Sequence, residues 1–481
     1  MNSIITLFLS LAFAILMLLP GTSQGATTEN IHFYSVLFNE NDIPGDCRMS
    51  IASLGGEITY TVPEIGFVQV KSNNNILSDL KSLPSVNSVN PSISWPVPAV
   101  QKTGLEEYLT LDYSDYPYIR DLEWDINRVT ENGASYNLGT GSNDVVIGII
   151  DSGIDRDHPD LVENLLPGSK NFVPAGGYRN TEPQETGAIH EFDDKIGHGS
   201  HIAGTIAANG QMLGVAPNTG IRAYRVFGES SAETAWVAAA IVTAANDGVD
   251  VISLSMEGFY LNGQIFYTDP LTGEKVALGN DIADFLAYKR VIQYAINKGC
   301  LVVAASGNEG MNMTEKRLVT NYLNSIYSGN GLYFVGAGFE VPGTIPGVVT
   351  VSSTGPYDTL ALYSNYGPGF IDLAAPGGDI SKYLEYQLSG RPPEDYFAEQ
   401  LYKNEFCLST NHQGGYIYNV GTSMAVPKVA AVASLIIDKY GKIGPQKVAE
   451  MLYKKGVESV SGKEQAYYGS GRLNAVKALT D

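Results

Sequence analysis

The stretch VVIGIIDSGID, residues 145–155, is an apolar run that ends on an acidic residue, Asp151. Such a run, followed by turn-forming residues, predicts a strand that is buried on both faces, as in a parallel sheet. Open parallel sheets bind their ligands at the carboxyl ends of the strands. The stretch therefore predicts an α/β fold with Asp151 at the functional edge. An aspartate at a strand end also serves as a turn or helix cap, and that interpretation stays open for this residue alone.

Apolar runs of the same kind recur and alternate with helical patterns. Further strands are predicted at residues 221–227, 250–256 and 300–306, and helices at 231–248 and 285–299. This alternation predicts a three-layer α/β/α domain with a mostly parallel central sheet. Four intervening stretches are expected to form surface insertions with long loops: residues 171–196, 257–279, 311–346 and 377–419.

The N-terminal part of the chain is organised differently. An apolar run at residues 4–19, followed by Pro20 and small residues, is typical of a secretory signal peptide, here 1–26. We expect a secreted protein; since the segment lacks Lys and Arg, an uncleaved segment that retains the protein at the cell surface is the alternative.

The region after the signal peptide has the pattern of a second, smaller domain. Residues 27–94 follow the order strand, helix, strand, strand, helix, strand, which predicts an α+β ferredoxin-like domain. Residues 95–122, rich in Pro and Tyr, predict a linker open to proteolysis. The main domain is expected at 123–481.

Composition excludes some partners. A formal charge of −21 over 481 residues lacks the basic footprint that nucleic-acid binding requires. Three cysteines, Cys47, Cys300 and Cys407, are too few for a disulfide framework. Cys300 lies in the apolar run CLVVAA and is predicted to be a buried thiol; pairing with Cys407 is the alternative.

Two more segments carry candidate chemistry. GHGSHIAGTIAANG, residues 197–210, places His198 at the start of a helix of small residues. A metal site formed with His201 is disfavoured, because the acidic residue expected between the two histidines of a zinc helix is absent, although Asp193 and Asp194 precede them.

The second segment is GTSMAVPKV, residues 421–429, which opens another helix of small residues on Ser423. One interpretation is a plain helix start, with Thr422 or Ser423 as cap and Pro427 in the first turns. The other is a nucleophile, whose small neighbours permit close approach by a substrate. A serine nucleophile needs an imidazole base, and that base needs a carboxylate to orient it. Asp151, His198 and Ser423 supply these roles.

These motifs together resemble those of the subtilisin-like serine proteases, peptidase family S8. DSGID, HGSHIAGTIAA and GTSMAVP are similar to the family's aspartate, histidine and serine motifs, in the family's order, and VVAASGNEG resembles its oxyanion motif. The resemblance covers residues 124–481 and implies a triad of Asp151, His198 and Ser423. It also implies that the Asn308 amide and the Ser423 N–H stabilise the oxyanion. Residues 214–255 further resemble lantibiotic leader peptidases.

The resemblance implies substrate contacts as well. The residues that would line the substrate cleft are Ser255, Met256, Glu257, Ala305, Ser306 and Gly307. Glu257 stands where subtilisins commonly carry glycine. Two interpretations stand: it pairs with a basic residue near the scissile bond, or it lies on the solvent face.

The expected function follows from the resemblance. It implies a secreted serine endopeptidase made as a self-processing zymogen, whose pro-domain inhibits it and which cleaves the leader peptide from a lantibiotic precursor. A broad-specificity extracellular protease and a non-catalytic binding protein on a protease fold are the alternatives. Catalysis requires no cofactor; structural calcium is common in the family, but no loop here is assigned to it. We expect a monomer acting on peptide or protein substrates.

Overall fold

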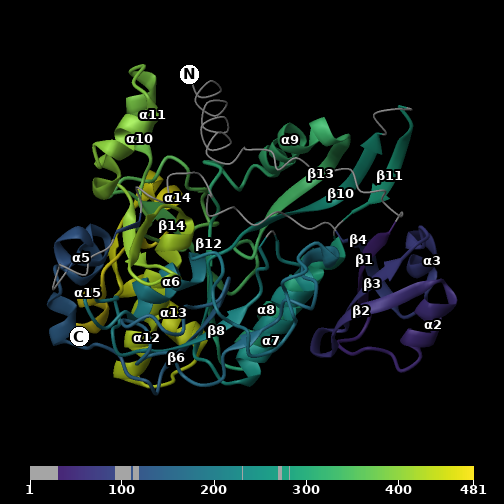
Figure 1. The fold of residues 1–481 in the computed structure, drawn as a ribbon, viewed down its shortest axis with the longest axis horizontal. Coiled ribbons are helices and arrows are strands. Elements are labelled where there is room, and N and C mark those ends of the chain that lie inside the picture. The colour runs from purple at the N-terminus through teal and green to yellow at the C-terminus, as the bar shows by residue number, and fades with distance from the viewer. Residues whose placement is uncertain are drawn as a thin grey trace.

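The computed structural model describes residues 31–92, 110–111, 119–229, 231–268, 273–280 and 282–480, and the predicted signal peptide and most of the linker lie outside these ranges. Its centre is a nine-stranded sheet (Figure 1). The strands, in spatial order, are β18 (Val457–Ser459), β19 (Gly471–Leu473), β15 (Leu373–Pro376), β14 (Val348–Thr354), β12 (Leu301–Ala305), β9 (Val251–Leu254), β6 (Val146–Asp151), β8 (Gly220–Arg225) and β7 (Lys170–Asn171). All neighbouring pairs are parallel except β18 and β19, as the alternating pattern predicts.

Helices cover both faces of this sheet, because alternate strand residues point to opposite sides. Ile147 and Val303 face a core shared with α5 (Trp124–Thr130), α6 (His198–Ala207), α12 (Thr422–Tyr440), α13 (Pro445–Lys454) and α15 (Ala475–Leu479). Val146 and Val302 face a second core shared with α7 (Thr234–Asn246) and α8 (Ile282–Asn297). The predicted three-layer α/β/α architecture is confirmed.

Residues 31–92 form a separate small body, here called the N-terminal module. Its elements are β1 (His32–Phe38), α2 (Cys47–Ser53), β2 (Gly56–Val62), β3 (Phe67–Ser72), α3 (Leu77–Ser82) and β4 (Val86–Pro91). The antiparallel sheet has the order β2-β3-β1-β4 and lies against α7 and α8 (Figure 1). Leu37 and Phe67 of the module belong to the same apolar core as these helices, so the contact is a packed interface.

The interface between module and main domain also buries two carboxylates. Asp284 at the start of α8 accepts hydrogen bonds from Ser35 Oγ and Asn90 Nδ2, both at 2.7 Å. Glu233, which precedes α7, accepts from Gln69 Nε2 and Ser92 Oγ, both at 3.0 Å. Because a buried carboxylate must be satisfied by donors, these bonds fix how the module sits on the main domain.

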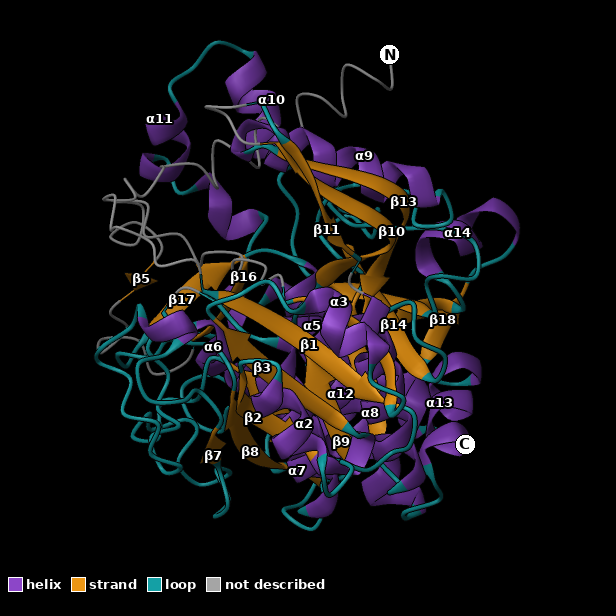
Figure 2. Ribbon diagram, turned by 90° about the vertical axis from the view of Figure 1, so that its right-hand side faces the viewer, coloured by secondary structure: helices purple, strands orange, loops and turns teal. Residues whose placement is uncertain are grey.

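The prediction that the insertions form long loops is partly wrong, because much of their sequence forms helices and strands. Residues 258–279 and 316–341 build an antiparallel sheet of β10 (Gly258–Thr268), β11 (Lys275–Gly279) and β13 (Leu332–Val341) with α9 (Lys316–Tyr327). We call this unit the arm; Figure 2 shows α9 lying across its sheet. Long-range pairing of β10 with β13 stabilises the arm. The local sequence of either strand does not predict this pairing.

The remaining elements named here lie in the linker, in the last insertion or near the C-terminus. These are β5 (Thr110–Leu111), β16 (Cys407–Thr410), β17 (Tyr416–Asn419), α10 (Ser381–Leu388), α11 (Pro393–Ala398) and α14 (Gln465–Tyr468). None of the helices in the described ranges is long and apolar enough to cross a membrane.

A buried ion pair joins α12 to α5. Lys428 Nζ lies 2.7 Å from Asp125 Oδ2, and both side chains have no exposed surface. The same ammonium donates to the carbonyl of Met424 at 2.9 Å. A Lys in a helix of small apolar residues therefore has a structural role: it ties the first turns of α12 to the beginning of the main domain.

Removing one member of this pair should be costly, because the other charge stays buried without compensation. We expect Lys428→Met to lower the free energy of unfolding by about 3–5 kcal/mol. The double variant Lys428→Met/Asp125→Leu should recover most of the loss. Urea unfolding followed by circular dichroism measures both, and losses that simply add would contradict direct coupling of the two residues.

Candidate active site

Asp151 and His198 meet at the carboxyl edge of the sheet. Asp151 is the last residue of β6 and is buried, and His198 is the first residue of α6. His198 Nδ1 lies 2.8 Å from Asp151 Oδ1, which also accepts from the N–H of Ser152 at 2.7 Å. This contact fixes the imidazole with Nδ1 facing the carboxylate.

Small residues allow this close approach. A Cβ on Gly199 would stand 2.1 Å from the carbonyl oxygen of Gly153, so only glycine lets α6 start this close to the end of β6. The N–H of Gly199 donates to Ser152 Oγ at 2.8 Å, and that of Ser200 donates to Asp194 Oδ2 at 2.8 Å. These bonds satisfy N–H groups at the helix start, which have no partner within the helix.

Ser423 is the second residue of α12. The N-cap is Gly421, and it makes no side-chain capping bond, so the expectation that Thr422 or Ser423 caps the helix is wrong. Ser423 Oγ donates to the carbonyl of Ser255 at 3.1 Å. Ser255 Oγ donates to the Ser423 carbonyl at 2.9 Å, which is free because Pro427, four residues later, has no N–H. Since Ser255 directly follows β9, this bond places Ser423 at the carboxyl edge of the sheet, where His198 also lies.

Asn308 follows β12 and contacts the start of α12. Its Oδ1 accepts from the N–H of Thr422 at 2.9 Å and from Thr422 Oγ1 at 3.0 Å. Its Nδ2 donates to Glu257 Oε1 at 3.0 Å. The predicted oxyanion residue is therefore next to Ser423, but one of its amide hydrogens is engaged by a carboxyl group.

Most of the predicted cleft residues are buried. Five of the six lie within the protein: Ser255, Met256, Ala305, Ser306 and Gly307. They can offer a substrate little beyond their backbone. The sixth, Glu257, is partly exposed, with its Oε2 buried. Neither expectation for Glu257 anticipated its bond to Asn308.

Two further glutamates lie beside Glu257 and were missed by the sequence reasoning. The pairing of Phe259 with Glu340 in the arm brings the latter close to Glu257. Glu309 directly follows Asn308, and its Oε2 accepts from the Asn308 N–H at 3.0 Å and from Asn365 Nδ2 at 2.7 Å. We call Glu257, Glu309 and Glu340 the acid cluster. Glu309 is part of the quoted VVAASGNEG motif, but Glu340 has no local signal.

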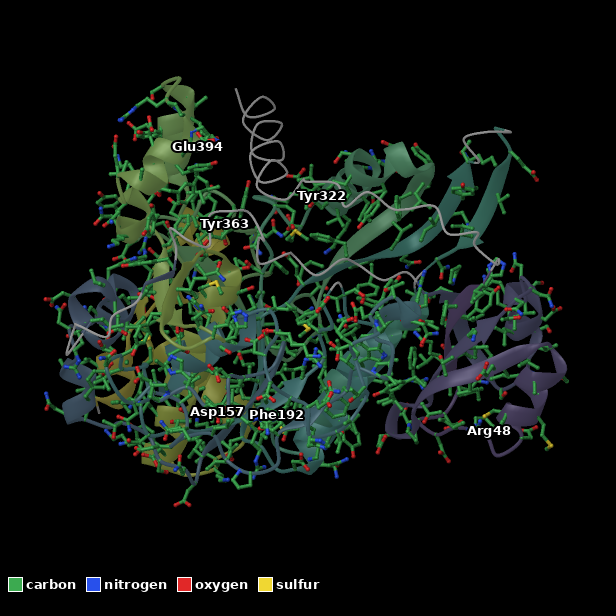
Figure 3. The ribbon with its side chains drawn as sticks, viewed as in Figure 1. Arg48, Asp157, Phe192, Tyr322, Tyr363 and Glu394 are labelled. Carbon is green, nitrogen blue, oxygen red and sulfur yellow. The ribbon has the colours of Figure 1, made fainter. Side chains whose placement is uncertain are left out.

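Burial and mutual repulsion change the charge state of the acid cluster. Burial, with the nearby Glu309 and Glu340, holds the pKa of Glu257 well above its usual value. Burial also raises the pKa of Glu309 to about 7. Tyr322 of α9 (Figure 3) has a raised pKa through its burial and the charges of Glu309 and Glu257. The cluster is therefore a site where an added positive charge would be strongly stabilised.

The two histidines of the 197–210 segment have separate environments. His201 Nε2 lies 3.1 Å from the Cys407 carbonyl, and burial lowers the pKa of His201 to about 3. Asp193 pairs with Arg156 instead. Within the described ranges, no group of three His, Cys, Asp or Glu side chains is arranged to hold a metal ion. Cys300 and Cys407 are free and buried, so the expected buried thiol at Cys300 is confirmed.

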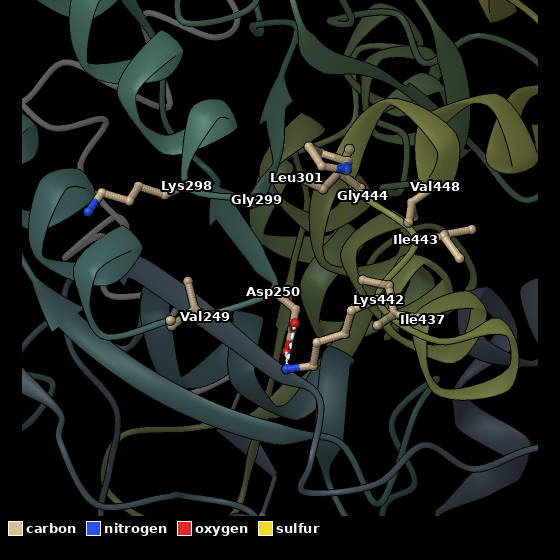
Figure 4. A pocket seen from close by; sticks show the side chains of 12 residues that line it. Val249, Asp250, Lys298, Gly299, Leu301, Ile437, Lys442, Ile443, Gly444 and Val448 are labelled. Carbon is tan, nitrogen blue, oxygen red and sulfur yellow. Dashed lines mark hydrogen bonds and ion pairs between the residues drawn. The ribbon is translucent and has the colours of Figure 1, made fainter.

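A pocket also lies at the amino edge of the sheet, opposite the edge that carries the candidate site. It is lined by residues that include Val249, Asp250 and Leu301, which stand at the amino ends of β9 and β12 (Figure 4). Asp250 there pairs with Lys442 at 2.8 Å. Because Asp151 ends β6, the candidate site is at the carboxyl edge and this pocket is not part of it.

Comparison with known proteins shows the family of the chain. The model of the subtilase family matches residues 142–471. The chain belongs to the subtilase family of serine proteases, as its motifs predict. It is 34% identical over 461 residues to the epidermin leader peptide-processing serine protease EpiP of Staphylococcus epidermidis, covering 94% of each chain.

Two other relatives extend the comparison. The chain is 38% identical over 339 residues to the nisin leader peptide-processing serine protease NisP of Lactococcus lactis subsp. lactis, covering 70% of this chain and 47% of that protein. A crystal structure of EpiP from Staphylococcus aureus superposes with a TM-score of 0.78 at 33% identity, covering 93% of this chain and 98% of that one. The matches to EpiP span nearly the whole chain and so extend into the N-terminal region.

The contact between Asp151 and His198 has a measurable electrostatic consequence. Burial alone would lower the pKa of His198, but the charge and hydrogen bond of Asp151 outweigh it and raise the pKa above its usual value. Since Asp151 favours the protonated ring, Asp151→Asn should lower the pKa of His198, leaving burial as the main influence. NMR titration of the histidine rings in a Ser423→Ala background measures this. His201 is the internal control and should stay neutral, and an unchanged His198 titration would contradict the interpretation.

Proposed function

We propose that this protein is a serine endopeptidase that uses Asp151, His198 and Ser423 as its triad. The observation that carries the proposal is the convergence of the Asp151–His198 contact, the start of α12 at Ser423 and the Asn308 side chain at one edge of the sheet. Membership of the subtilase family supports it independently.

The proposed reaction follows from these positions. Ser423 Oγ attacks the scissile carbonyl carbon while His198 Nε2 takes its proton, and the Nδ1–H bond to Asp151 stabilises the resulting imidazolium. The negative oxygen that forms is stabilised by the Ser423 N–H and the Asn308 amide. His198 then protonates the leaving amine, and water hydrolyses the acyl-enzyme by the same proton transfers in reverse.

We propose a zymogen in which the N-terminal module is an inhibitory pro-domain, released by a cut in the linker at 95–122. The packed and hydrogen-bonded interface with α7 and α8 supports a stable complex. Burial raises the pKa of Asp284 to about 6 and that of Glu233 to about 7. We further propose export by the segment 1–26, with a secreted product.

The substrate we propose is a lantibiotic precursor, from which the enzyme removes the leader peptide. Similarity to EpiP across 94% of both chains, module included, supports this substrate class. The acid cluster beside Ser423 favours a basic side chain on the acyl side of the cut, since a guanidinium or ammonium would neutralise buried carboxylates.

The catalytic roles are tested by labelling and kinetics. We expect a fluorophosphonate to label the processed protein, and Ser423→Ala to abolish both labelling and peptide cleavage. Asn308→Ala should lower kcat by about 10²- to 10³-fold with little change in KM, because it removes a donor used only in the transition state. Ser434→Ala, a buried serine of the same helix, is the matched control and should still label. Equal labelling of Ser423→Ala would exclude the proposed nucleophile.

The substrate class is tested by mass spectrometry. The full-length protein is incubated with a thioether-bridged precursor peptide and, separately, with casein. We expect one dominant cut at the junction of leader and core, after a basic residue, and self-cleavage within 95–122. Efficient cleavage of casein at many sites would instead indicate a broad-specificity extracellular protease.

A further inference from the structure

Glu257 forms a hydrogen bond with Asn308, the one side chain that the proposed oxyanion site requires. Asn308 is anchored at its oxygen end, where Oδ1 accepts two hydrogen bonds from Thr422. Its nitrogen end donates to Glu257 Oε1 at 3.0 Å. A donor stabilises an oxyanion best when it is oriented toward that oxygen beforehand, and a carboxyl group that holds the amide competes for it.

Glu257 and Glu340 accept fewer hydrogen bonds than Glu309, the third member of the acid cluster. Glu309 Oε2 receives two hydrogen bonds, and Glu340 Oε1 receives one from the Gly343 N–H at 3.3 Å. In the part of the chain that the structure describes, Glu257 Oε2 is buried without a hydrogen-bond partner, and its Oε1 depends on Asn308. Since Glu340 is fully buried and Glu257 is partly exposed, Glu257 is the member of this pair that a new partner can reach and draw away.

The space around Glu257 is arranged for such a change. A Cβ on Gly307 would stand 2.1 Å from Glu257 Oε2, 2.3 Å from Asn365 Nδ2 and 3.1 Å from Glu309 Oε2, so the two carboxyl groups and the amide that bonds Glu309 converge over a residue that has no side chain. Glu340 is fully buried, and its Oε2 also has no hydrogen-bond partner among the described residues. A cation that enters here meets unsatisfied carboxyl oxygens, and a charge-assisted bond to guanidinium is about twice as strong as one to a neutral amide.

We propose that Glu257 restrains Asn308 in the free enzyme and that a basic substrate side chain releases it. The guanidinium or ammonium of the residue before the scissile bond pairs with Glu257, the carboxylate leaves the amide, and Asn308 Nδ2 turns to the developing oxyanion. Thr422 keeps the Oδ1 end in place throughout. Any proton that Glu257 carries in the free state passes to solvent. This inference rests on the proposed protease function and adds that the substrate itself completes the site.

The consequence is that selectivity appears in the rate of the chemical step. A residue that merely binds the basic side chain would change KM and leave kcat alone. A residue that withholds a transition-state donor lowers kcat for every substrate that fails to displace it. The two roles of Glu257 are therefore distinguishable by steady-state kinetics.

The test compares peptides with arginine or its neutral isostere citrulline before the scissile bond. In the wild type, kcat should be higher for arginine. Glu257→Ala should raise kcat on citrulline by about tenfold, the value of one hydrogen bond, and remove the difference in kcat. Glu257→Gln should keep kcat low for both peptides, because its carbonyl still accepts from Asn308 and has no charge to follow a cation.

Glu340→Gln is the matched charge control. It removes a carboxylate of the same cluster that does not bond Asn308, so it should raise KM for arginine without the increase in kcat on citrulline. If Glu257→Ala changes only KM for arginine and leaves kcat on citrulline as it was, the gating role is wrong while the protease function stands. If the wild type cleaves neither peptide, or Ser423→Ala cleaves as well as the wild type, the function itself fails.

A measurement on the unaltered protein guards against misfolded variants. Addition of ethylguanidinium to the wild type with a glycine peptide should raise kcat, since the free cation can pair with Glu257 where the substrate has no side chain. Inhibition alone, with no increase at any concentration of the cation, would overturn the proposal.

Discussion

The burial of α12 is the constraint on which the site depends. Fifteen of its nineteen residues are buried, and it packs against α6 and against β9, β12, β14 and β15. A helix enclosed in this way cannot shift along its axis without opening cavities in the core. Ser423 is thereby fixed at the edge of the sheet where β6 ends on Asp151. The Lys428–Asp125 ion pair adds a second restraint within the same helix, one turn beyond the serine.

This constraint explains how much of the site the sequence could predict. Asp151, His198 and Ser423 each stand at the end of an element whose own pattern is strong, so local sequence locates them. The need for glycine at position 199, in the HGS segment, is evident only from the structure, where the carbonyl of Gly153 lies against Gly199. The sequence analysis gave no role to Lys428, because its partner Asp125 lies about 300 positions away along the chain.

The acid cluster was beyond local reasoning for the same physical reason. Glu257 and Glu340 are brought together by the β10–β13 ladder, and strand pairing over such separations depends on the whole arm. The insertions were expected as loops because they intervene between the predicted strands and helices of the main sheet. Their stability comes instead from non-local pairing and from α9, which buries Val319 and Leu323 against the small sheet.

The same energetic logic applies at the two places where this acidic chain buries carboxylates. At the module interface, Asp284 and Glu233 each receive two donors from the N-terminal module, so their burial is compensated within the docked chain. In the acid cluster the donors are fewer, and two carboxyl oxygens have no partner among the described residues. A buried carboxyl oxygen without a hydrogen-bond donor destabilises the free protein. A ligand that brings a positive charge to this oxygen therefore gains binding free energy by removing that cost.

That difference gives a physical reason for a protease to accept a weakened oxyanion site. In the proposed mechanism, an enzyme with a fully formed site would hydrolyse any peptide that reaches Ser423, its own surface loops included. In the proposed mechanism, the bond of Glu257 to Asn308 lowers that general reactivity, and a substrate with a basic side chain restores it by pairing with Glu257. Binding energy spent in this way lowers the barrier only for the correct substrate, which suits the proposed removal of a leader peptide by a single cut.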